Sequence, residues 1–300
     1  WLIRREIWEN KGSLFWTPAI IGALMVLFIA ITGIWGLASG HLLNGGIHVN
    51  GRTVDALHMF SALDENQRRE FVSTLTGSYL ISAVPLLLTM SVTVFFYCLG
   101  ALHDERRDRS ILFWKSLPLS DQSTVLSKVA TALCVAPLVV LAVAVATSLA
   151  VLFLGAVLFA FKGQNVFGVL LTTPELYLAP LQLVALLPIY MLWALPTVGW
   201  LLMVSSWARS KVFLWAVGTP LLLGAHLKWA SMITGQDLGV GWYMENIVVR
   251  GLGSLLPTWI SDERMPARLL FEEGSRGIDM GNVVLHSYLT LTHAEMWIGA

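Results

Sequence analysis

Long apolar runs dominate the pattern of hydrophobic and polar positions. Crossing the hydrocarbon core of a bilayer takes about 20 apolar residues. Five stretches meet this length, and only one of them contains a charged residue, Lys228. We predict membrane spans at residues 18–38, 79–102, 129–158, 178–208 and 212–233. Because a lipid-embedded backbone must satisfy its own hydrogen bonds, these spans predict an all-α, polytopic membrane helix bundle.

Two of the runs are longer than a bilayer requires. Residues 129–161 and 176–208 are uncharged for 33 residues each, which corresponds to roughly 50 Å of helix. We therefore expect both to be tilted, bent or protruding. Pro180, Pro188 and Pro196 predict kinks in the second of them, since proline removes a helical hydrogen bond.

The two ends of the chain carry further helix signals. Residues 1–15 place most apolar side chains on one helical face and most polar ones on the other, so we predict an interfacial helix along the inner leaflet. The alternative is an irregular lead-in to the first span. Thr292 and Glu295 resemble a capping box, so we expect a sixth, truncated span that starts near Ala294. The native start is expected upstream of Trp1.

Polar connections separate the spans, and two of them are sizeable outer loops, residues 39–78 and 234–282. Residues 39–54 are rich in Gly and Asn and are expected to be irregular, whereas 55–74 have helical periodicity. Within the second outer loop only residues 242–259 are apolar enough to dip into the membrane.

Composition and charge sharpen this picture. The chain is 56% hydrophobic and only 13% charged, against about 25% charged in soluble proteins. Its zero net charge argues against nucleic-acid binding. With a cytoplasmic N-terminus, the inner segments hold ten Lys and Arg in 48 residues and the outer ones eight in 103. The positive-inside rule favours that orientation.

Cys98 and Cys134 lie within apolar runs and are expected to be small core residues.

The most charged short stretch is His103–Asp121, within the predicted cytoplasmic loop 103–128. Its spacing allows the helical pairs Asp104–Arg107 and Glu105–Arg109, so an extension of the second span is expected. An apolar, aromatic-rich patch follows, and Ser120 or Asp121 is expected to cap the third span. Aromatic residues beside arginines are typical of interface anchors. Docking onto a soluble partner and a self-contained, solvated turn are both compatible with this pattern.

Two segments carry a resemblance to a known family. Phe95–Asp121 (FFYCLGALHDERRDRSILFWKSLPLSD) and Arg5–Pro18 (REIWENKGSLFWTP) resemble permease subunits of type-2 ATP-binding-cassette (ABC) exporters. The resemblance implies a six-helix fold and a coupling helix at Ser110–Leu117 that docks on an ATPase subunit. The implied contact residues are Arg106, Arg107, Arg109, Ser110, Ile111, Leu112, Phe113, Trp114, Lys115 and Leu117. The polar length of residues 234–282 departs from the family, in which this region often carries short apolar re-entrant helices.

The resemblance also implies partners. Two ATPase subunits would bind ATP and Mg, a second permease subunit would complete a homo- or heterodimer, and the pair would lie in the bacterial inner membrane. The chain contains no phosphate-binding loop of the G-x-x-x-x-G-K-[ST] type. We therefore expect no cofactor and no ATP hydrolysis in this chain.

Few other residues suggest chemistry. Lys228, five residues from the outer end of the fifth span, is a candidate intramembrane functional group or a lysine that snorkels to the interface. His226 is more plausible as a satisfied bundle histidine than as a ligand. We find no catalytic arrangement and no standard metal motif. The alternative to an exporter subunit is another integral membrane protein, either a secondary transporter or a membrane anchor or assembly protein.

Overall fold

The computed structural model describes residues 1–39, 47–49, 52–54, 76, 81–110, 120–161, 175–256 and 280–291. Nearly all of these residues are helical, and five helices are long and apolar enough to cross a membrane. The candidate spans are Gly12–Ala38, Val84–Arg107, Asp121–Leu158, Leu187–Trp207 and Val212–Thr234. The prediction of a helical chain with several helices long and apolar enough to span a membrane is therefore confirmed, and all but the fourth lie close to their predicted positions.

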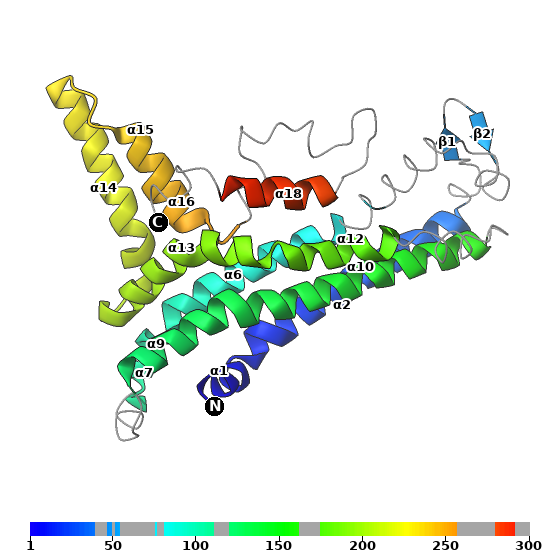
Figure 1. Cartoon of the computed structure of the whole chain (residues 1–300), viewed down its shortest axis with the longest axis horizontal. Helices are drawn as coiled ribbons and strands as arrows, with labels where there is room; N and C mark the ends of the chain where they lie inside the picture. Colours follow the sequence, from blue (N-terminus) through cyan, green and yellow to red (C-terminus); the bar gives the residue numbers. More distant parts are fainter. Residues whose placement is uncertain are drawn as a thin grey trace.

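The first three spans are composite helices (Figure 1). π-helical segments link the straight parts of the first and third spans, whereas the second begins with a 3₁₀ turn and passes from α6 to α7 at Leu102. The first consists of α1 (Leu2–Glu9), η1 (Gly12–Trp16) and α2 (Thr17–Ala38). The second consists of η2 (Ile81–Ala83), α6 (Val84–Ala101) and α7 (His103–Arg107). The third consists of α9 (Asp121–Ala130), η3 (Thr131–Val135) and α10 (Ala136–Phe161).

The fourth span is divided in two. Its parts are α12 (Glu175–Ala185) and α13 (Leu187–Trp207), which meet at Leu186. Pro188 lies in the first turn of α13, where a missing backbone N–H costs nothing. Of the three prolines expected to kink this run, Pro188 marks the break, while the helix continues through Pro196. The single span predicted at 178–208 was therefore too long.

The fifth span is followed by a helical segment that turns back. α14 (Val212–Thr234) diverges from the other spans (Figure 1). Gly235 and Gly239, both at positive φ, then reverse the chain into α15 (Val240–Tyr243), η4 (Met244–Val249) and α16 (Arg250–Gly253). This returning segment packs against α14 and α13.

Two hydroxyl contacts fix the depth of the returning segment. The Thr197 and Ser254 hydroxyl oxygens lie 2.5 Å apart, and Ser91 donates to the Leu255 carbonyl at 2.6 Å. Thr197 and Ser91 lie in the middle of α13 and α6, so the described part of predicted segment 242–259 does return into the bundle. Beyond it, α18 (Met280–Thr290) packs on α12, where Tyr288 donates to the Ala185 carbonyl.

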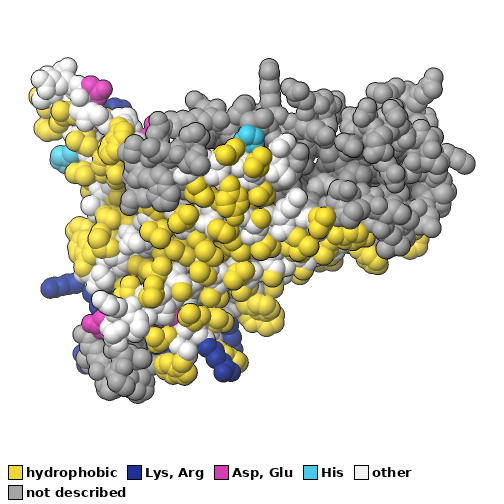
Figure 2. All heavy atoms as spheres, viewed as in Figure 1, with side chains coloured by type: hydrophobic (Ala, Val, Ile, Leu, Met, Phe, Trp, Pro, Cys, Tyr) yellow, Lys and Arg dark blue, Asp and Glu magenta, His cyan; other side chains and the backbone are white. Residues whose placement is uncertain are grey.

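The core lies where α6, η3 and α13 meet. Cys98 is buried and Cys134 half-buried, and both are free thiols, as expected of core residues. α2 packs along α10 at Gly22, where an added Cβ would lie 2.6 Å from Thr147 Oγ1. The outward faces are apolar: Phe28 and Leu222 are 68% and 66% exposed. Figure 2 shows hydrophobic side chains over the middle of the molecule, as expected of a lipid-facing surface.

A short hairpin interrupts the first outer loop. β1 (Ile47–Val49) and β2 (Arg52–Val54) pair antiparallel, with His48 opposite Thr53. The prediction that residues 39–54 are irregular was therefore wrong at these strands. The sequence between them is Asn50-Gly51, the dipeptide most typical of hairpin turns. The expected helix at 55–74 and the sixth span near Ala294 lie outside the described residues.

Candidate functional site

Charged side chains from three helices meet at one end of the bundle, which we call the base (lower left in Figure 1). Here α1 packs on α9, and α7 extends α6 beyond the spans. We name the residues that join these helices the basal cluster: Arg5, Glu6, Glu9, Tyr97, Glu105 and Lys128. Glu6 and Lys128 are only 3% and 2% exposed.

The amphipathic pattern of α1 explains why Glu6 is buried. The polar face of α1, which carries Arg5 and Glu6, turns toward α9 and α7. Its apolar face looks outward, with Trp1 75% and Trp8 61% exposed. The predicted helix at residues 1–15 is thus present as α1 and η1. Its exposed aromatics suit a membrane interface, where tryptophan is enriched.

Lys128 is the centre of the basal cluster. Its Nζ donates to Glu6 Oε1 and to Glu105 Oε1, each at 2.9 Å. One buried ammonium therefore links α9 to both α1 and α7. A buried charge of this kind is tolerated only when it is paired and hydrogen-bonded.

Arg5 and Tyr97 complete the pairing of the acids. Arg5 Nη2 donates to Glu105 Oε1 at 2.6 Å, and Arg5 Nε donates to Glu9 Oε1 at 2.7 Å. The Tyr97 hydroxyl donates to Glu6 Oε2 at 2.9 Å. Burial lowers the pKa of Arg5, but the hydrogen bonds and charges of Glu9 and Glu105 outweigh it and raise that pKa above its usual value. The guanidinium therefore stays charged at any physiological pH.

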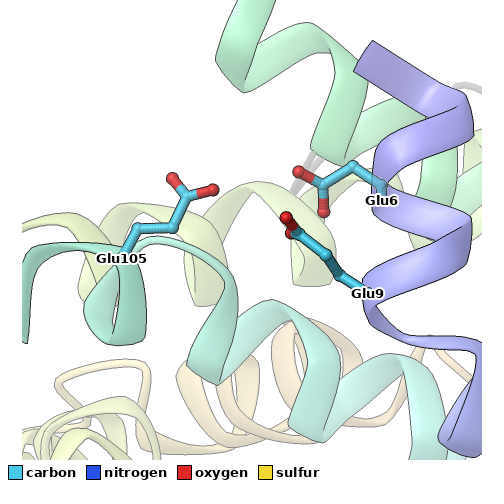
Figure 3. Close-up of side chains that lie close together, drawn as sticks. All are labelled: Glu6, Glu9 and Glu105. Atoms are coloured by element: carbon cyan, nitrogen blue, oxygen red, sulfur yellow. The ribbon is translucent and has the colours of Figure 1, made fainter. Parts of the chain in front are cut away.

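Three carboxylates of this cluster lie close enough to suggest a metal site. Oxygens of Glu6, Glu9 and Glu105 lie within 4.8 Å of one another, and Figure 3 shows Glu105 on α7 opposite the other two on α1. However, Lys128 and Arg5 already supply positive charge at 2.6–2.9 Å from these oxygens. The cations that these carboxylates bind are thus two side chains of the protein, and we assign no metal here.

A second set of contacts holds α7 to the end of α13. Arg106 Nη2 donates to the carbonyls of Ser205 at 2.7 Å and Ala208 at 2.8 Å. The buried Ser205 hydroxyl accepts from the Leu102 and His103 backbone N–H groups and donates to the Leu99 carbonyl. Glu105 and Arg106, adjacent in sequence, therefore bind different sides of the bundle.

The predicted docking residues divide at Ser110. Arg106 is turned inward, whereas Arg107 and Arg109 are exposed. Arg109 has a φ of 57° just beyond the last residue of α7. Ser110 donates to the Glu105 carbonyl. The remaining predicted contact residues, Ile111, Leu112, Phe113, Trp114, Lys115 and Leu117, lie outside the described residues.

Local pairing along α7 differs from the prediction. Glu105 binds Arg5 and Lys128 rather than Arg109, and Asp104 lies 3.1 Å from the ring of His103. Glu105 takes long-range partners because it faces α1 and α9, whereas Asp104 contacts its neighbour His103. The predicted cap is present: Ser120 Oγ accepts the Ser123 N–H at the start of α9.

The two candidate residues of the fifth span lie on its surface. Lys228 is exposed and has no ion-pair partner in the described part of the chain. His226 is also exposed, and its ring contacts Trp229 and the Leu222 carbonyl. The expectation that His226 lies in the bundle interior was therefore wrong. Within the described part of the chain, neither residue belongs to a polar cluster.

Sequence reasoning missed Glu6, Tyr97, Lys128 and Ser205. Glu6 is one of the polar residues of the predicted helix at 1–15, and Lys128 was counted only among the cations of the inner segments. One signal was present: Lys128 directly precedes a 33-residue uncharged run, so it lies at the boundary of the third apolar span. The acids that bind it could not be identified, because their pairing depends on how α1 folds back.

Comparisons with known proteins add no identity: no family model, no curated protein and no solved structure matches this chain. The site is therefore interpreted from its own geometry.

Proposed function

We propose that the chain is the membrane-spanning permease subunit of a type-2 ABC exporter. A separate ATPase, carrying ATP and Mg, would dock on residues 103–121. A second permease subunit would complete the pathway, and the N-terminus would face the cytoplasm of a bacterial inner membrane. This chain would break no covalent bond itself.

The observation that carries the proposal is the set of buried contacts that hold the start of this loop, which we call its root, against the helix bundle. Glu105 binds α1 and α9 through Arg5 and Lys128, and Arg106 binds the end of α13. A solvated turn does not need buried charges at its root. A loop that receives a mechanical push does need them, because they pass the displacement to several spans at once.

Charge burial also makes the root rigid. Moving Glu105 away from both Arg5 and Lys128 would break two ion pairs of a largely buried cluster at once, at a cost of several kcal/mol. The loop root and the helices that it contacts are therefore expected to move as one body. This is the property that coupling to an ATPase requires.

Substitution at the predicted docking patch tests the proposal. The chain is purified from its native membrane with alanine at both Phe113 and Trp114. We expect loss of the co-purifying ATPase polypeptide, because aromatic anchors dominate interface energies. The matched control replaces Trp1 and Trp8, two exposed aromatics at the same end, and should retain the ATPase. An ATPase retained equally by both double variants would contradict the proposal.

A further inference from the structure

A partly open cleft of about 710 Å³ adjoins the basal cluster. It lies between α1 on one side and α6 with α7 on the other. Figure 3 views this region, with Glu105 facing Glu6 and Glu9 from the opposite wall. Its volume is in the range of about 300–1,000 Å³ that is typical of sites for small molecules.

The cleft has two chemically different ends along α6 and α7. At one end lie Val92 and Phe96, which are 57% and 59% exposed and belong to the apolar surface of the span. At the other end lie Asp104 and Asp108, both exposed. Val92 and Asp104 are separated by roughly 18 Å of helix. An occupant that matches this lining is elongated, with an apolar body and a polar head.

The charge of the lining selects the sign of that head. Five carboxylates and two basic side chains line the cleft, an excess of three negative charges. The two bases, Arg5 and Lys128, are engaged by Glu6, Glu9 and Glu105. Asp104 and Asp108 remain at the surface, and the side chain that contacts Asp104 is His103, whose Nδ1 lies 3.1 Å from Asp104 Oδ1. The head group that complements this end is a cation.

We propose that this cleft binds amphipathic organic cations from the inner leaflet. The ammonium group lies at Asp104 and Asp108, and the apolar body lies along Val92 and Phe96. Glu9 on the α1 wall, whose side chain is 51% exposed, adds to the negative electrostatic potential of the cleft. The binding needs neither ATP nor a partner subunit, so it stands or falls separately from the exporter proposal.

Equilibrium binding of two matched ions tests this. Decyltrimethylammonium and decyl sulfonate share the same elongated apolar chain and carry head groups of opposite charge. The full chain is placed in phosphatidylcholine nanodiscs, and binding to empty nanodiscs is subtracted. We expect saturable binding of the ammonium and none of the sulfonate. Equal saturable binding of both ions, or of neither, would overturn the proposal.

Charge-removing variants then locate the site. Asp104→Asn and Asp108→Asn are each expected to weaken ammonium binding two- to fivefold, the size of a typical exposed charge pair. Combining them with Glu9→Gln should weaken it roughly tenfold or more. The control is Asp237→Asn, an exposed acid beyond the end of α14, which should bind as the wild type does. Asp108 is exposed, so its replacement does not put folding at risk. Wild-type affinity in both Asp108→Asn and the triple variant would refute the site.

Discussion

At the scale of single residues, the base of the molecule is governed by the cost of buried charge. Lys128 and Glu6 are almost fully buried, yet each lies within 3 Å of an opposite charge. A buried pair adds little net stability compared with an apolar pair of the same shape, but breaking it by removing one partner is costly. The basal cluster therefore enforces one arrangement of α1, α7 and α9.

Removing the central ammonium should show this cost. Lys128→Met leaves Glu6 and Glu105 without their buried partner, so we expect destabilisation of about 3–5 kcal/mol. Thermal unfolding of the purified chain, followed by tryptophan fluorescence, measures it. Lys228→Met is the control, because Lys228 is exposed on α14, and should change stability by less than about 0.5 kcal/mol. Similar melting of the two variants would mean that the basal cluster does not hold the helices.

A neighbouring pair of serines offers a second comparison. Ser205 is buried and satisfies three backbone groups at the α7 root, whereas the exposed Ser206 binds only the Met203 carbonyl of its own helix. Ser205→Ala leaves two backbone N–H groups without their acceptor and should cost about 1–3 kcal/mol. Ser206→Ala should be nearly neutral in the same melting experiment. Equal effects would show that the α7–α13 contact is unimportant.

At the scale of elements, sequence periodicity and length located the spans but not how they join. The five apolar runs became five helices because their backbones have no alternative in lipid. The break at Leu186 and the position of Pro188 followed local proline rules. The orientation of α1 did not follow from its amphipathic pattern. A polar face is compatible with water and also with other charged groups, and the partners of Glu6 come from helices about 90 and 120 residues away along the chain.

Packing between α2 and α10 gives an element-scale prediction. Gly22→Ala would place a Cβ 2.6 Å from the Thr147 hydroxyl, a buried and short side chain with little room to move. We expect destabilisation of about 1–3 kcal/mol from overpacking. Gly155→Ala on α10 meets no atom within 4 Å, and should instead stabilise its helix by about 0.5–1 kcal/mol. Opposite signs in thermal unfolding support this packing, and equal signs contradict it.

At the scale of the whole molecule, the basal cluster lies at one end of the bundle while the middle is apolar. Figure 2 shows Lys and Arg near the lower edge and a broad hydrophobic surface above them. α1, α7 and the start of α9 all lie at the base, and the hairpin between α14 and α15 lies away from it (Figure 1). We propose that these two ends face opposite sides of a membrane, and the positive-inside rule predicts that the base faces the cytoplasm.

Cysteine labelling tests this orientation. Asp108→Cys and Asp237→Cys are made singly in a chain in which Cys98 and Cys134 are replaced by alanine. Both positions are exposed. In spheroplasts, a membrane-impermeant maleimide should label Asp237→Cys, and it should reach Asp108→Cys only after permeabilisation. The reverse order would invert the topology, and labelling of both positions in intact spheroplasts would rule out a spanning bundle between them.

The central claim is that this chain is driven by an ATPase bound at residues 103–121. Its most direct test is the rate of ATP hydrolysis by the complex extracted from native membranes with the intact chain. Wild-type preparations should hydrolyse ATP, and preparations with alanine at Phe113 and Trp114 should have lost that activity while the chain itself still melts like the wild type. Absence of ATP hydrolysis from the wild-type preparation, or the same rate in both preparations, would contradict the claim.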